Sequence, residues 1–375
     1  MSPNQTPAPW LKHIRQDVQS MHAYAVQDST GMVKLDAMEN PHRLPSSLQQ
    51  KLGQRLGSLA LNRYPDTRIQ DLRQALAVYA GMPKDCDIML GNGSDELISL
   101  LALACARPAD AQGKRPVVLA PVPGFVMYAM SAQLQGLDFV GVALRADFSL
   151  DTPGMLQAIA QHEPAIVYLA YPNNPTATLW DQADMASVVE AAAQTGSIVV
   201  IDEAYQPFSS LSYIDHIRNH PEQHTHVLLM RTLSKFGLAG VRLGYLLGRS
   251  ELIAQIDKVR PPYNISVLNC ECALFALEHA HVFAAQAAEI CAERNRLTLA
   301  LRAMPTITVW NSEANMILVR LENHPVQSVF EKLKAKGILV KNVSKMHPLL
   351  AQCLRLTVGT THENTQLLAA LQEIL

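Results

Sequence analysis

Short apolar runs alternate with longer segments of helical periodicity over the first two thirds of the chain. Apolar positions that recur about every 3.6 residues predict helices at Ser46–Leu61, Asp66–Ala80 and Met185–Thr195. The apolar runs predict strands at Ile88–Leu90, Val117–Ala120, Phe139–Leu144, Ile166–Ala170, Ile198–Ile201, Val227–Met230 and Leu243–Leu247. Because helical segments lie between many of these strands, the pattern predicts an α/β fold whose mostly parallel sheet has helices on both faces.

The pattern changes beyond about Arg260. It predicts helices at Val267–His279, His281–Met304 and Val326–Lys336, and strands at Ile307–Trp310, Met316–Leu321, Ile338–Lys341 and Leu354–Val358. This mixture indicates a smaller α+β domain. We therefore predict an N-terminal arm at 1–45 that is part of the small domain, a large domain at 46–260 and a small domain at 261–375. The Arg260-Pro261-Pro262 stretch is the predicted hinge.

The composition supports a folded protein of this size. The chain has 375 residues, of which 49% are hydrophobic and 17% are charged, so a large core is possible and global disorder is excluded. The formal net charge is -2 and the basic residues are scattered. Binding to nucleic acid or to a membrane surface is therefore not predicted, and neither is a metal site.

A cytoplasmic location is predicted. No segment approaches the roughly 18 apolar residues that span a bilayer, and Met1–Arg15 lacks the apolar core of a signal peptide. The six cysteines form no C-x-x-C pair. Most of them lie inside apolar patterns, where a free thiol behaves as a small hydrophobe, which favours a reducing compartment.

Asp202 ends a long apolar run that begins at Ser197. The run predicts a buried strand, and in open α/β sheets ligands bind at the carboxyl ends of the strands. A functional carboxylate is one interpretation of this position. A turn or cap aspartate that follows a strand is the other.

Lys235 lies between an apolar run and a glycine-bearing loop, although lysine leaves water only when it has a partner. A desolvated lysine has a lowered pKa and can attack a carbonyl to form an imine. Arg242, at the end of the loop, offers a planar fork for a phosphate or a carboxylate. An exposed Lys and Arg on a surface loop is the alternative, but the hydroxyls and glycines around Lys235 favour a site.

Two further segments fit a ligand site. Asn174 precedes a proline, which biases it away from helix, so its amide can point at a ligand from a strand exit; an ordinary turn is the alternative. Gly91-Asn92-Gly93 leads into a helix whose first turn contains Ser94 and Asp95, and free N–H groups there can bind a phosphate. This segment is not a dinucleotide fingerprint, because Glu96 stands where that fingerprint needs glycine.

These segments combine into a family resemblance. The motifs G-S-D-E, P-G-F-x-x-Y, N-N-P-T, D-E-A-Y and S-K-x-G-L-A-G-x-R follow one another in this order. In this order and spacing the chain resembles the fold-type I, class II aminotransferases that depend on pyridoxal 5'-phosphate (PLP), over nearly its whole length. Within that group it most resembles the histidinol-phosphate aminotransferases, on the segments Glu39–Pro41, Arg63–Asp66 and Cys353–Thr360.

The resemblance implies roles at the cofactor ring. Lys235 would hold PLP as a Schiff base and move the substrate proton. Asp202 would keep the ring nitrogen protonated, while Tyr205 and Asn174 would hydrogen-bond the ring oxygen. Phe125 would stack on the ring, although an ordinary core aromatic would be buried as well.

It also implies the contacts of the cofactor phosphate. Ser94, Asp95, Ser234 and Arg242 would bind it, with backbone N–H groups as the donors at the first two positions. Tyr64 would reach it from the neighbouring subunit, which implies a homodimer with shared sites. Without the resemblance, Tyr64 is simply a tyrosine in a turn.

The substrate end is predicted from the last strand. Alternation places Leu354, Leu356 and Val358 on one face and Cys353, Arg355 and Thr357 on the other, so Arg355 faces either solvent or a polar site. The resemblance implies that the substrate is bound by Arg355, Asn174, Lys341 and Tyr24. Lys341 replaces an arginine of the family and loses its bidentate geometry. Tyr24 is equally well explained as a packing residue of the arm.

Three other departures from the family pattern are small. Met38 stands where the family often has asparagine, and Ala177 replaces the usual glycine. The loop from Lys235 to Arg242 is one residue shorter than in some relatives. None of these changes is expected to abolish catalysis.

The resemblance therefore predicts transfer of an amino group from L-histidinol phosphate to 2-oxoglutarate, which gives imidazole acetol phosphate and glutamate in histidine biosynthesis. An aromatic or other amino-acid aminotransferase of the same fold, with Arg355 on a carboxylate, is one alternative. A threonine-phosphate decarboxylase is another, because a fold does not fix which bond at Cα breaks. A cofactor-binding regulator is disfavoured, since no DNA-binding domain or basic patch is evident.

Overall fold

The computed structural model describes residues 9–21 and 27–375. The chain divides into two compact units, 1–31 and 32–375. In the first unit the described residues form η1 (Pro9–His13) and α1 (Gln16–Ser20), and neither contains a buried residue. Tyr24 lies outside the described residues, so its predicted role is not addressed by the structure.

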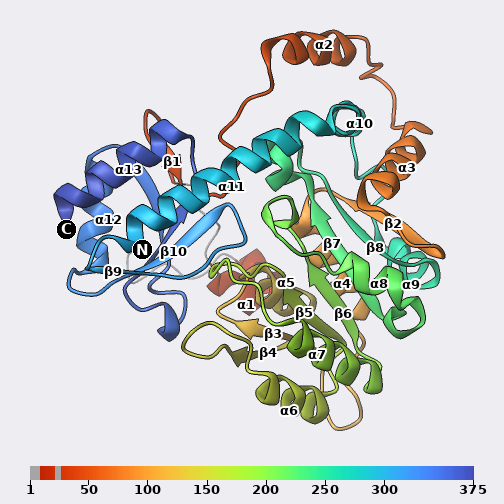
Figure 1. Ribbon diagram of the computed structural model, residues 1–375. Coiled ribbons are helices and arrows are strands. Elements are labelled where there is room, and N and C mark those ends of the chain that lie inside the picture. The colour runs from red at the N-terminus through yellow and green to blue at the C-terminus, as the bar shows by residue number, and fades with distance from the viewer. Residues whose placement is uncertain (1–8, 22–26) are drawn as a thin grey trace. The chain divides into compact units, whose positions relative to one another are not determined.

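The larger unit contains a seven-stranded sheet in the order β2-β8-β7-β6-β5-β3-β4 (Figure 1). Its strands are β2 (Cys86–Gly91), β3 (Val117–Val122), β4 (Asp138–Ala143), β5 (Ile166–Ala170), β6 (Ile198–Asp202), β7 (Val227–Thr232) and β8 (Gly244–Arg249). Strand β8 is antiparallel to both of its neighbours, and the other strands share one direction. The mostly parallel sheet that the apolar runs predict is confirmed.

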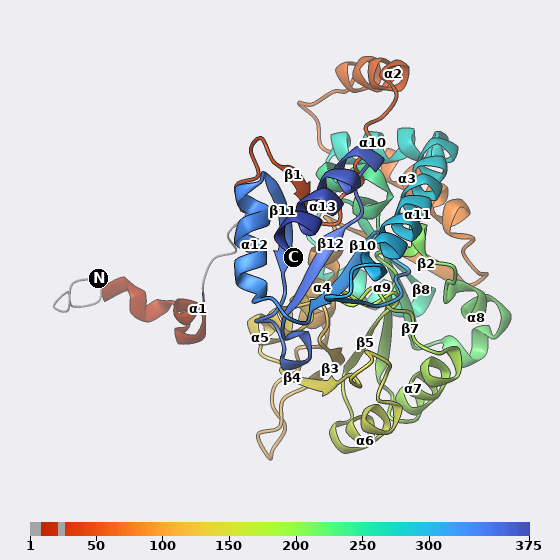
Figure 2. The same ribbon diagram turned by 60° about the vertical axis from the view of Figure 1, so that its left-hand side comes forward.

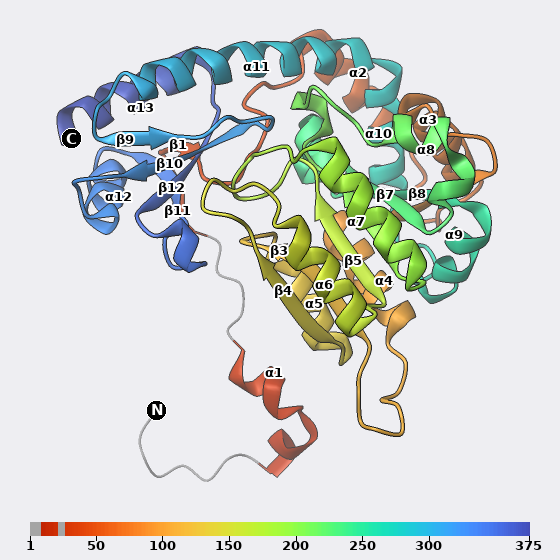
Figure 3. The same ribbon diagram turned by 60° about the horizontal axis from the view of Figure 1, so that its bottom comes forward.

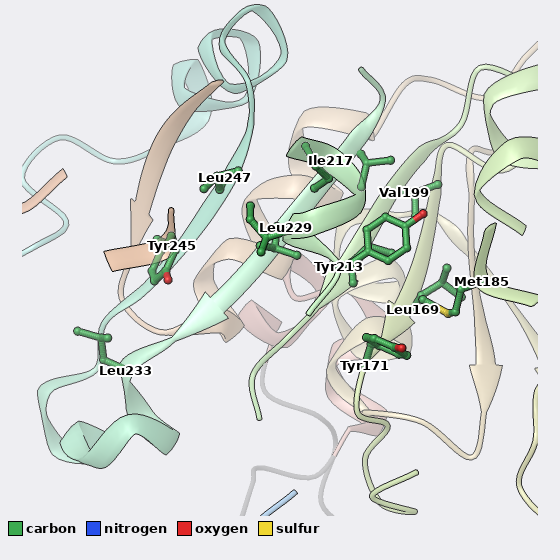
Figure 4. Close-up of a cluster of buried hydrophobic side chains, with 14 of the residues drawn as sticks. Leu169, Tyr171, Met185, Val199, Tyr213, Ile217, Leu229, Leu233, Tyr245 and Leu247 are labelled. Atoms are coloured by element: carbon green, nitrogen blue, oxygen red, sulfur yellow. The ribbon is translucent and has the colours of Figure 1, made fainter. Parts of the chain in front are cut away.

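Helices cover both faces of this sheet. One face is covered by α4 (Ser94–Cys105), α5 (Met127–Gln135) and α9 (Ser250–Ile256). The other is covered by α3 (Arg68–Ala80), α6 (Thr152–His162), α7 (Gln182–Gln194), α8 (Ile214–Asn219) and α10 (Val267–Glu278). Alternate residues of a strand point to opposite faces of the sheet. In β7, Leu229 packs with the helices of the second face, in the cluster shown in Figure 4, whereas Leu228 and Met230 pack with α4, α5 and α9 on the first face. The central strands are therefore apolar along most of their length, with polar residues such as Asp202 and Arg231 only at their carboxyl ends.

A second, five-stranded sheet has the order β1-β11-β12-β10-β9 (Figure 2). Its strands are β1 (Val33–Leu35), β9 (Ile307–Val309), β10 (Met316–Leu321), β11 (Ile338–Asn342) and β12 (Cys353–Thr357), and it packs with α12 (Val326–Ala335) and α13 (Thr361–Ile374). Helix α11 (Ala280–Arg302) joins the two halves of the unit (Figure 3), because Phe283 packs with the first sheet and Leu297 with the second. The predicted α+β character of this part is confirmed.

The sequence did not predict β1, and it placed some helix ends wrongly. Strand β1 has three residues, of which only Leu35 is buried, so it carries no apolar run. Helix α2 (Ser46–Gly57) stops before the predicted end at Leu61. Helix α3 begins at Arg68 rather than Asp66, because the Asp66 carboxylate accepts a hydrogen bond from the Arg68 N–H group and so precedes the first turn. The domain boundaries at residues 45 and 260 stay a prediction.

None of the helices in the described ranges is both long enough and apolar enough to cross a membrane. The helix expected after Gly93 is α4, and five of its apolar residues are buried: Leu97, Ile98, Leu100, Leu101 and Ala102. All six cysteines of the chain are free thiols. Within the described part of the chain, no cluster of His, Cys, Asp or Glu has the arrangement of a metal site.

Candidate active site

The candidate site lies where the parallel strands of the first sheet end. Strands β2, β3, β5, β6 and β7 end at the edge where β8 begins, because β8 runs in the opposite direction. A cavity of about 340 Å³ opens at this edge. Nine of the predicted site residues line it: Ser94, Asp95, Phe125, Asn174, Asp202, Tyr205, Ser234, Lys235 and Arg242.

Lys235 lies on a π-helical turn, η4 (Ser234–Leu238), that follows β7 directly. Its Nζ donates a hydrogen bond to the carbonyl oxygen of Ala37 at 2.9 Å. Burial, with the nearby Arg355 guanidinium as the next cause, lowers the pKa of Lys235 to about 8. A lysine with this pKa is neutral in a useful fraction of molecules near neutral pH, so it can act as a nucleophile and accept a proton.

Asp202 is the last residue of β6 and is 5% exposed. Its Oδ2 accepts a hydrogen bond from the Tyr128 hydroxyl at 2.6 Å, and its Oδ1 accepts one from the Ala204 N–H group at 3.0 Å. Burial raises the pKa of Asp202 to about 6, and the Tyr128 hydrogen bond opposes this shift. The structure thus presents a buried carboxyl group that lines the cavity.

Tyr128 was not predicted as a site residue, although it lines the cavity. It lies in the first turn of α5, one turn after Phe125. The signal in the sequence was its place in the P-G-F-x-x-Y motif. That motif gave a role to Phe125 and none to Tyr128.

One end of the cavity is suited to a phosphate. Helix α4 begins there behind Gly93, whose φ is 82°, and no side-chain hydrogen bond caps its first turn. A Cβ atom on Gly93 would lie 2.6 Å from Nη2 of Arg242, so glycine leaves room for that guanidinium. Arg242 also pairs with Asp95 at 3.2 Å, and the hydroxyls of Thr232 and Ser234 lie nearby. A helix N-terminus, hydroxyls and a guanidinium together are phosphate donors.

The remaining cavity residues offer a ring face and hydroxyl and amide donors. Phe125 is half-buried and lies edge-on to Tyr128, with ring centroids 5.7 Å apart. Burial raises the pKa of Tyr205 far above its usual range, so its hydroxyl stays protonated and can donate a hydrogen bond. Asn174 is 7% exposed, and its Oδ1 accepts a hydrogen bond from Arg355.

Arg355, on β12 of the second sheet, contacts the cavity residue Asn174, but neither Arg355 nor Lys341 lines the cavity itself. It is 8% exposed, and its two Nη atoms donate to Oδ1 of Asn174 at 2.8 Å and to the carbonyl oxygen of Asp36 at 2.9 Å. Of the two interpretations of its strand face, the polar site is therefore the right one. Lys341 is directly opposite Arg355 in the pairing of β11 with β12, so both side chains lie on the same face of the sheet.

Tyr64 does not reach the cavity of its own chain. It lies in the segment between α2 and α3, is 77% exposed, and stacks on Tyr263 with ring centroids 4.7 Å apart. The predicted contact of Tyr64 needs a second subunit. It stays a prediction, as do the individual roles of the other site residues.

A buried ion pair, between Glu203 and Arg231, lies next to Asp202. Glu203, next to Asp202, accepts hydrogen bonds from Nε of Arg231 at 2.9 Å and from the Ser212 hydroxyl at 2.9 Å. The side chain of Glu203 is fully buried and that of Arg231 is 7% exposed. Because a buried charge must be paired, this contact fixes the ends of β6 and β7 relative to each other.

Comparison with known proteins identifies the family. A family model described as "Aminotransferase class I and II" matches residues 30–371. The chain belongs to the class I and II aminotransferases. This aminotransferase is 65% identical over 372 residues to the histidinol-phosphate aminotransferase of Polaromonas naphthalenivorans, which covers 99% of each chain. It is 66% identical over 363 residues to that of Paracidovorax citrulli, which covers 96% of this chain and 97% of the relative.

A solved structure confirms the fold of this aminotransferase. The histidinol-phosphate aminotransferase from Sinorhizobium meliloti, in complex with pyridoxal-5'-phosphate, superposes with a TM-score of 0.81 at 23% identity. The match covers 95% of this chain and 96% of the other. The predicted PLP fold type I is therefore confirmed.

Class I and II aminotransferases use PLP as their cofactor, and the residues around the cavity fit it. A helix N-terminus and Arg242 match its phosphate, and the buried Asp202 matches its ring nitrogen. Lys235 would supply a primary amine for its aldehyde. The space that Gly93 leaves beside Arg242 belongs to the same phosphate cradle.

Proposed function

We propose that the protein transfers the amino group of L-histidinol phosphate to 2-oxoglutarate, in the biosynthesis of histidine. The observation that carries this proposal is Arg355, a buried arginine of the second sheet that hydrogen-bonds the cavity residue Asn174, with Lys341 beside it. These two cations are additional to Arg242 at the cofactor-phosphate end. The 65% identity to a named histidinol-phosphate aminotransferase over 99% of both chains supports the same substrate.

In this proposal the chain holds PLP through contacts at its phosphate and at its ring. The first turn of α4 at Ser94 and Asp95 offers N–H groups to the phosphate, and Ser234 and Arg242 offer side-chain donors. Phe125 packs on the ring, while Tyr205 and Asn174 donate hydrogen bonds to the ring oxygen.

Bound PLP supplies an electron-accepting ring that lets a substrate lose the proton on Cα. Lys235 accepts that proton and returns it, which its lowered pKa permits. Asp202 holds the proton on the ring nitrogen, because an ionised carboxylate is the partner that a protonated nitrogen needs.

We propose that Arg355 and Lys341 bind the phosphate of the substrate. Arg355 is held by Asn174 and by the Asp36 carbonyl, so its guanidinium is positioned before the substrate arrives. Lys341 contributes charge without bidentate geometry. Tyr24 is the third predicted phosphate contact.

We also propose a cytoplasmic homodimer with shared sites. Tyr64 and its stacking partner Tyr263 are 77% and 57% exposed, and Leu61 is 64% exposed. Large apolar groups exposed in one region favour burial against another subunit. In the dimer, Tyr64 of one subunit would contact the cofactor phosphate of the other.

The test is the absorbance spectrum of the PLP-loaded protein during a titration with L-histidinol phosphate. We expect the visible band of the bound cofactor to disappear and to return when 2-oxoglutarate is added. If an aromatic amino acid removes the band and L-histidinol phosphate does not, the enzyme is an aminotransferase for another substrate. If carbon dioxide is released from threonine phosphate instead, the decarboxylase alternative is right.

The same titration with an Arg355→Ala variant tests the phosphate contact. We expect the concentration of L-histidinol phosphate needed for half of the change to rise by about 10- to 100-fold, because a hydrogen-bonded charge is lost. Arg320→Ala is the control, since Arg320 lies in the same sheet and donates to the Leu349 carbonyl away from the cavity. Equal affinities in the two variants would show that Arg355 does not bind the substrate.

A further inference from the structure

Tyr128 is a buried side chain that the proposed mechanism does not use. It is 2% exposed, and its hydroxyl makes a 2.6 Å hydrogen bond to Asp202. We infer that Tyr128 is a positioning residue that keeps Asp202 ionised and aligned toward the ring nitrogen of the cofactor. This inference rests on the cofactor role proposed for Asp202.

Two aromatic neighbours hold the ring of Tyr128 in place. Its ring is stacked on the ring of Tyr168 from β5, with centroids 4.2 Å apart and an interplanar angle of 7°. The half-buried Phe125 lies edge-on against it. Because both neighbours fix the ring plane, the hydroxyl is held in line with Oδ2 of Asp202.

The direction of the hydrogen bond is fixed as well. Burial and the neighbouring Asp202 raise the pKa of Tyr128 well above its usual range, so the phenol keeps its proton and acts as the donor. The other oxygen of Asp202 accepts from the Ala204 backbone. Each oxygen of the carboxylate thus has one fixed donor, and these two contacts set its orientation at the cavity.

Apart from the hydrogen bonds from Tyr128 and from the Ala204 backbone, the environment of Asp202 favours the neutral acid. Burial is the largest cause, and the carboxylates of Asp95 on α4 and Glu203 at the end of β6 act in the same direction. Tyr168 and Tyr205 contribute no charge because burial raises the pKa of each far above its usual range. The cations Lys235 and Arg242 line the same cavity, but neither is among the causes that shift the pKa of Asp202. Tyr128 is therefore the side chain that offsets the burial of Asp202 by a direct hydrogen bond.

This arrangement has a chemical consequence for the reaction. A neutral carboxylic acid is a poor partner for a protonated ring nitrogen, whereas a carboxylate stabilises it. If Tyr128 holds Asp202 in the charged form, it controls how strongly the ring accepts electrons without touching the reacting atoms. Its loss should lower kcat and leave the binding of the substrate phosphate unchanged.

The chain offers a matched pair of variants for the test. Tyr128→Phe keeps the ring between Tyr168 and Phe125 and removes only the hydroxyl. Tyr168→Phe removes a hydroxyl from the adjacent ring, which is also fully buried and has no hydrogen-bond partner among the described residues. Both full-length variants would first be compared with the native protein by thermal unfolding, so that a folding defect is recognised.

The first readout is the nitrogen-15 NMR shift of the ring nitrogen in PLP bound to each protein. We expect Tyr128→Phe to move it toward the unprotonated form, and Tyr168→Phe to leave it as in the native protein. The second readout is the infrared titration of the Asp202 carboxyl in the full chain stripped of cofactor. We expect its pKa to be higher in Tyr128→Phe by roughly one unit or more, because a hydrogen bond to the charged form is lost.

The kinetic expectation is a fall in kcat of about 10-fold or more in Tyr128→Phe, with little change in KM for the amino donor. Native-like values of both spectroscopic readouts in Tyr128→Phe would overturn the inference, as would equal shifts in the two variants. Neither spectroscopic readout uses a substrate. A wrong substrate assignment and a wrong role for Tyr128 are therefore distinguishable.

Discussion

Lys235 illustrates how a single residue can lower the stability of the protein that contains it. Its ammonium group is desolvated beside Arg355, and its pKa falls to about 8 from the ordinary value of 10.5. In that interval the unfolded chain binds more protons than the folded chain does. The free energy of unfolding therefore rises with pH across the interval and is lowest below it, where the folded protein must hold the charged form.

We predict that a Lys235→Met variant lacks this dependence. In cofactor-free protein, the native free energy of unfolding should rise relative to that of the variant by up to about 3 kcal/mol between pH 8 and 10.5. Lys235 is partly exposed to the open cavity, and this exposure reduces the expected rise in the free energy of unfolding. Urea unfolding of both proteins across this range is the measurement. Two parallel curves would mean that Lys235 is not desolvated.

At this scale the sequence identified residue types well and contacts poorly. Lys235 and Asp202 were predicted because their neighbours in the chain form recognisable motifs, and both line the cavity. The contact between Tyr128 and Asp202 depends on how α5, which packs against β3 and β4, is placed relative to the end of β6, and no local pattern encodes this. Two departures from the family pattern have a physical meaning that also needed the structure. Met38 and Ala177 have φ of 52° and 61°, a region that asparagine and glycine, the usual residues there, adopt more readily.

Among the elements, the turn η4 determines where Lys235 points. Gly237, two residues after Lys235, has a φ of 137°, which disrupts the regular helix. A Cβ atom there would lie 2.8 Å from Cδ1 of Phe283 and 3.1 Å from Nδ2 of Asn40. The turn is thus confined by α11 on one side and by the residues after β1 on the other.

We predict that Gly237→Ala lowers the free energy of unfolding by about 1–3 kcal/mol and also reduces transamination, because the turn must shift with Lys235 on it. Gly337→Ala is the matched control. Gly337 also has a positive φ, of 77°, but open space surrounds its Cβ position. We expect this control to lose about 1 kcal/mol of stability and to keep its activity. Urea unfolding and steady-state rates would be measured for both, and equal losses of activity would contradict the prediction.

The elements themselves were largely predictable from the sequence. Buried parallel strands are continuous apolar runs, and those of the first sheet were found in order, with only their ends displaced. Strand β1 was missed because its stability comes from pairing with β11 and not from its own three residues. A sequence pattern can predict a strand only where the strand's own residues are apolar. A strand that is stabilised by pairing with a segment far away in the sequence does not need such a pattern.

For the whole molecule, the open question is the second subunit. In one chain, Tyr64 is exposed outside the cavity that it is predicted to complete. If the site is shared, each cavity takes Lys235 from one subunit and Tyr64 from the other. A dimer of one subunit that lacks Tyr64 and one subunit that lacks Lys235 then has one intact site.

We predict that a mixture of Tyr64→Ala and Lys235→Ala subunits, unfolded and refolded together, has more transaminase activity than the sum of the separate variants. The subunit that retains Lys235 receives Tyr64 from its partner. Lys235→Ala alone should lose at least about 100-fold in rate, since the proton acceptor is missing. Light scattering would report the dimer, and a mixture that gives only the sum would contradict the shared site.

The pairing of β1 with β11 also sets the time at which the enzyme can become active during its synthesis. The carbonyl groups of Ala37 and Asp36, which hold Lys235 and Arg355, follow β1 directly. Strand β1 is anchored in its sheet through β11, which the ribosome makes near the end of translation. The first sheet can form on the nascent chain long before then, because its strands end at Arg249. An interrupted chain therefore contains Lys235 and most of the residues that line the cavity, yet it lacks the strand that supports the carbonyl groups beside Lys235 and Arg355.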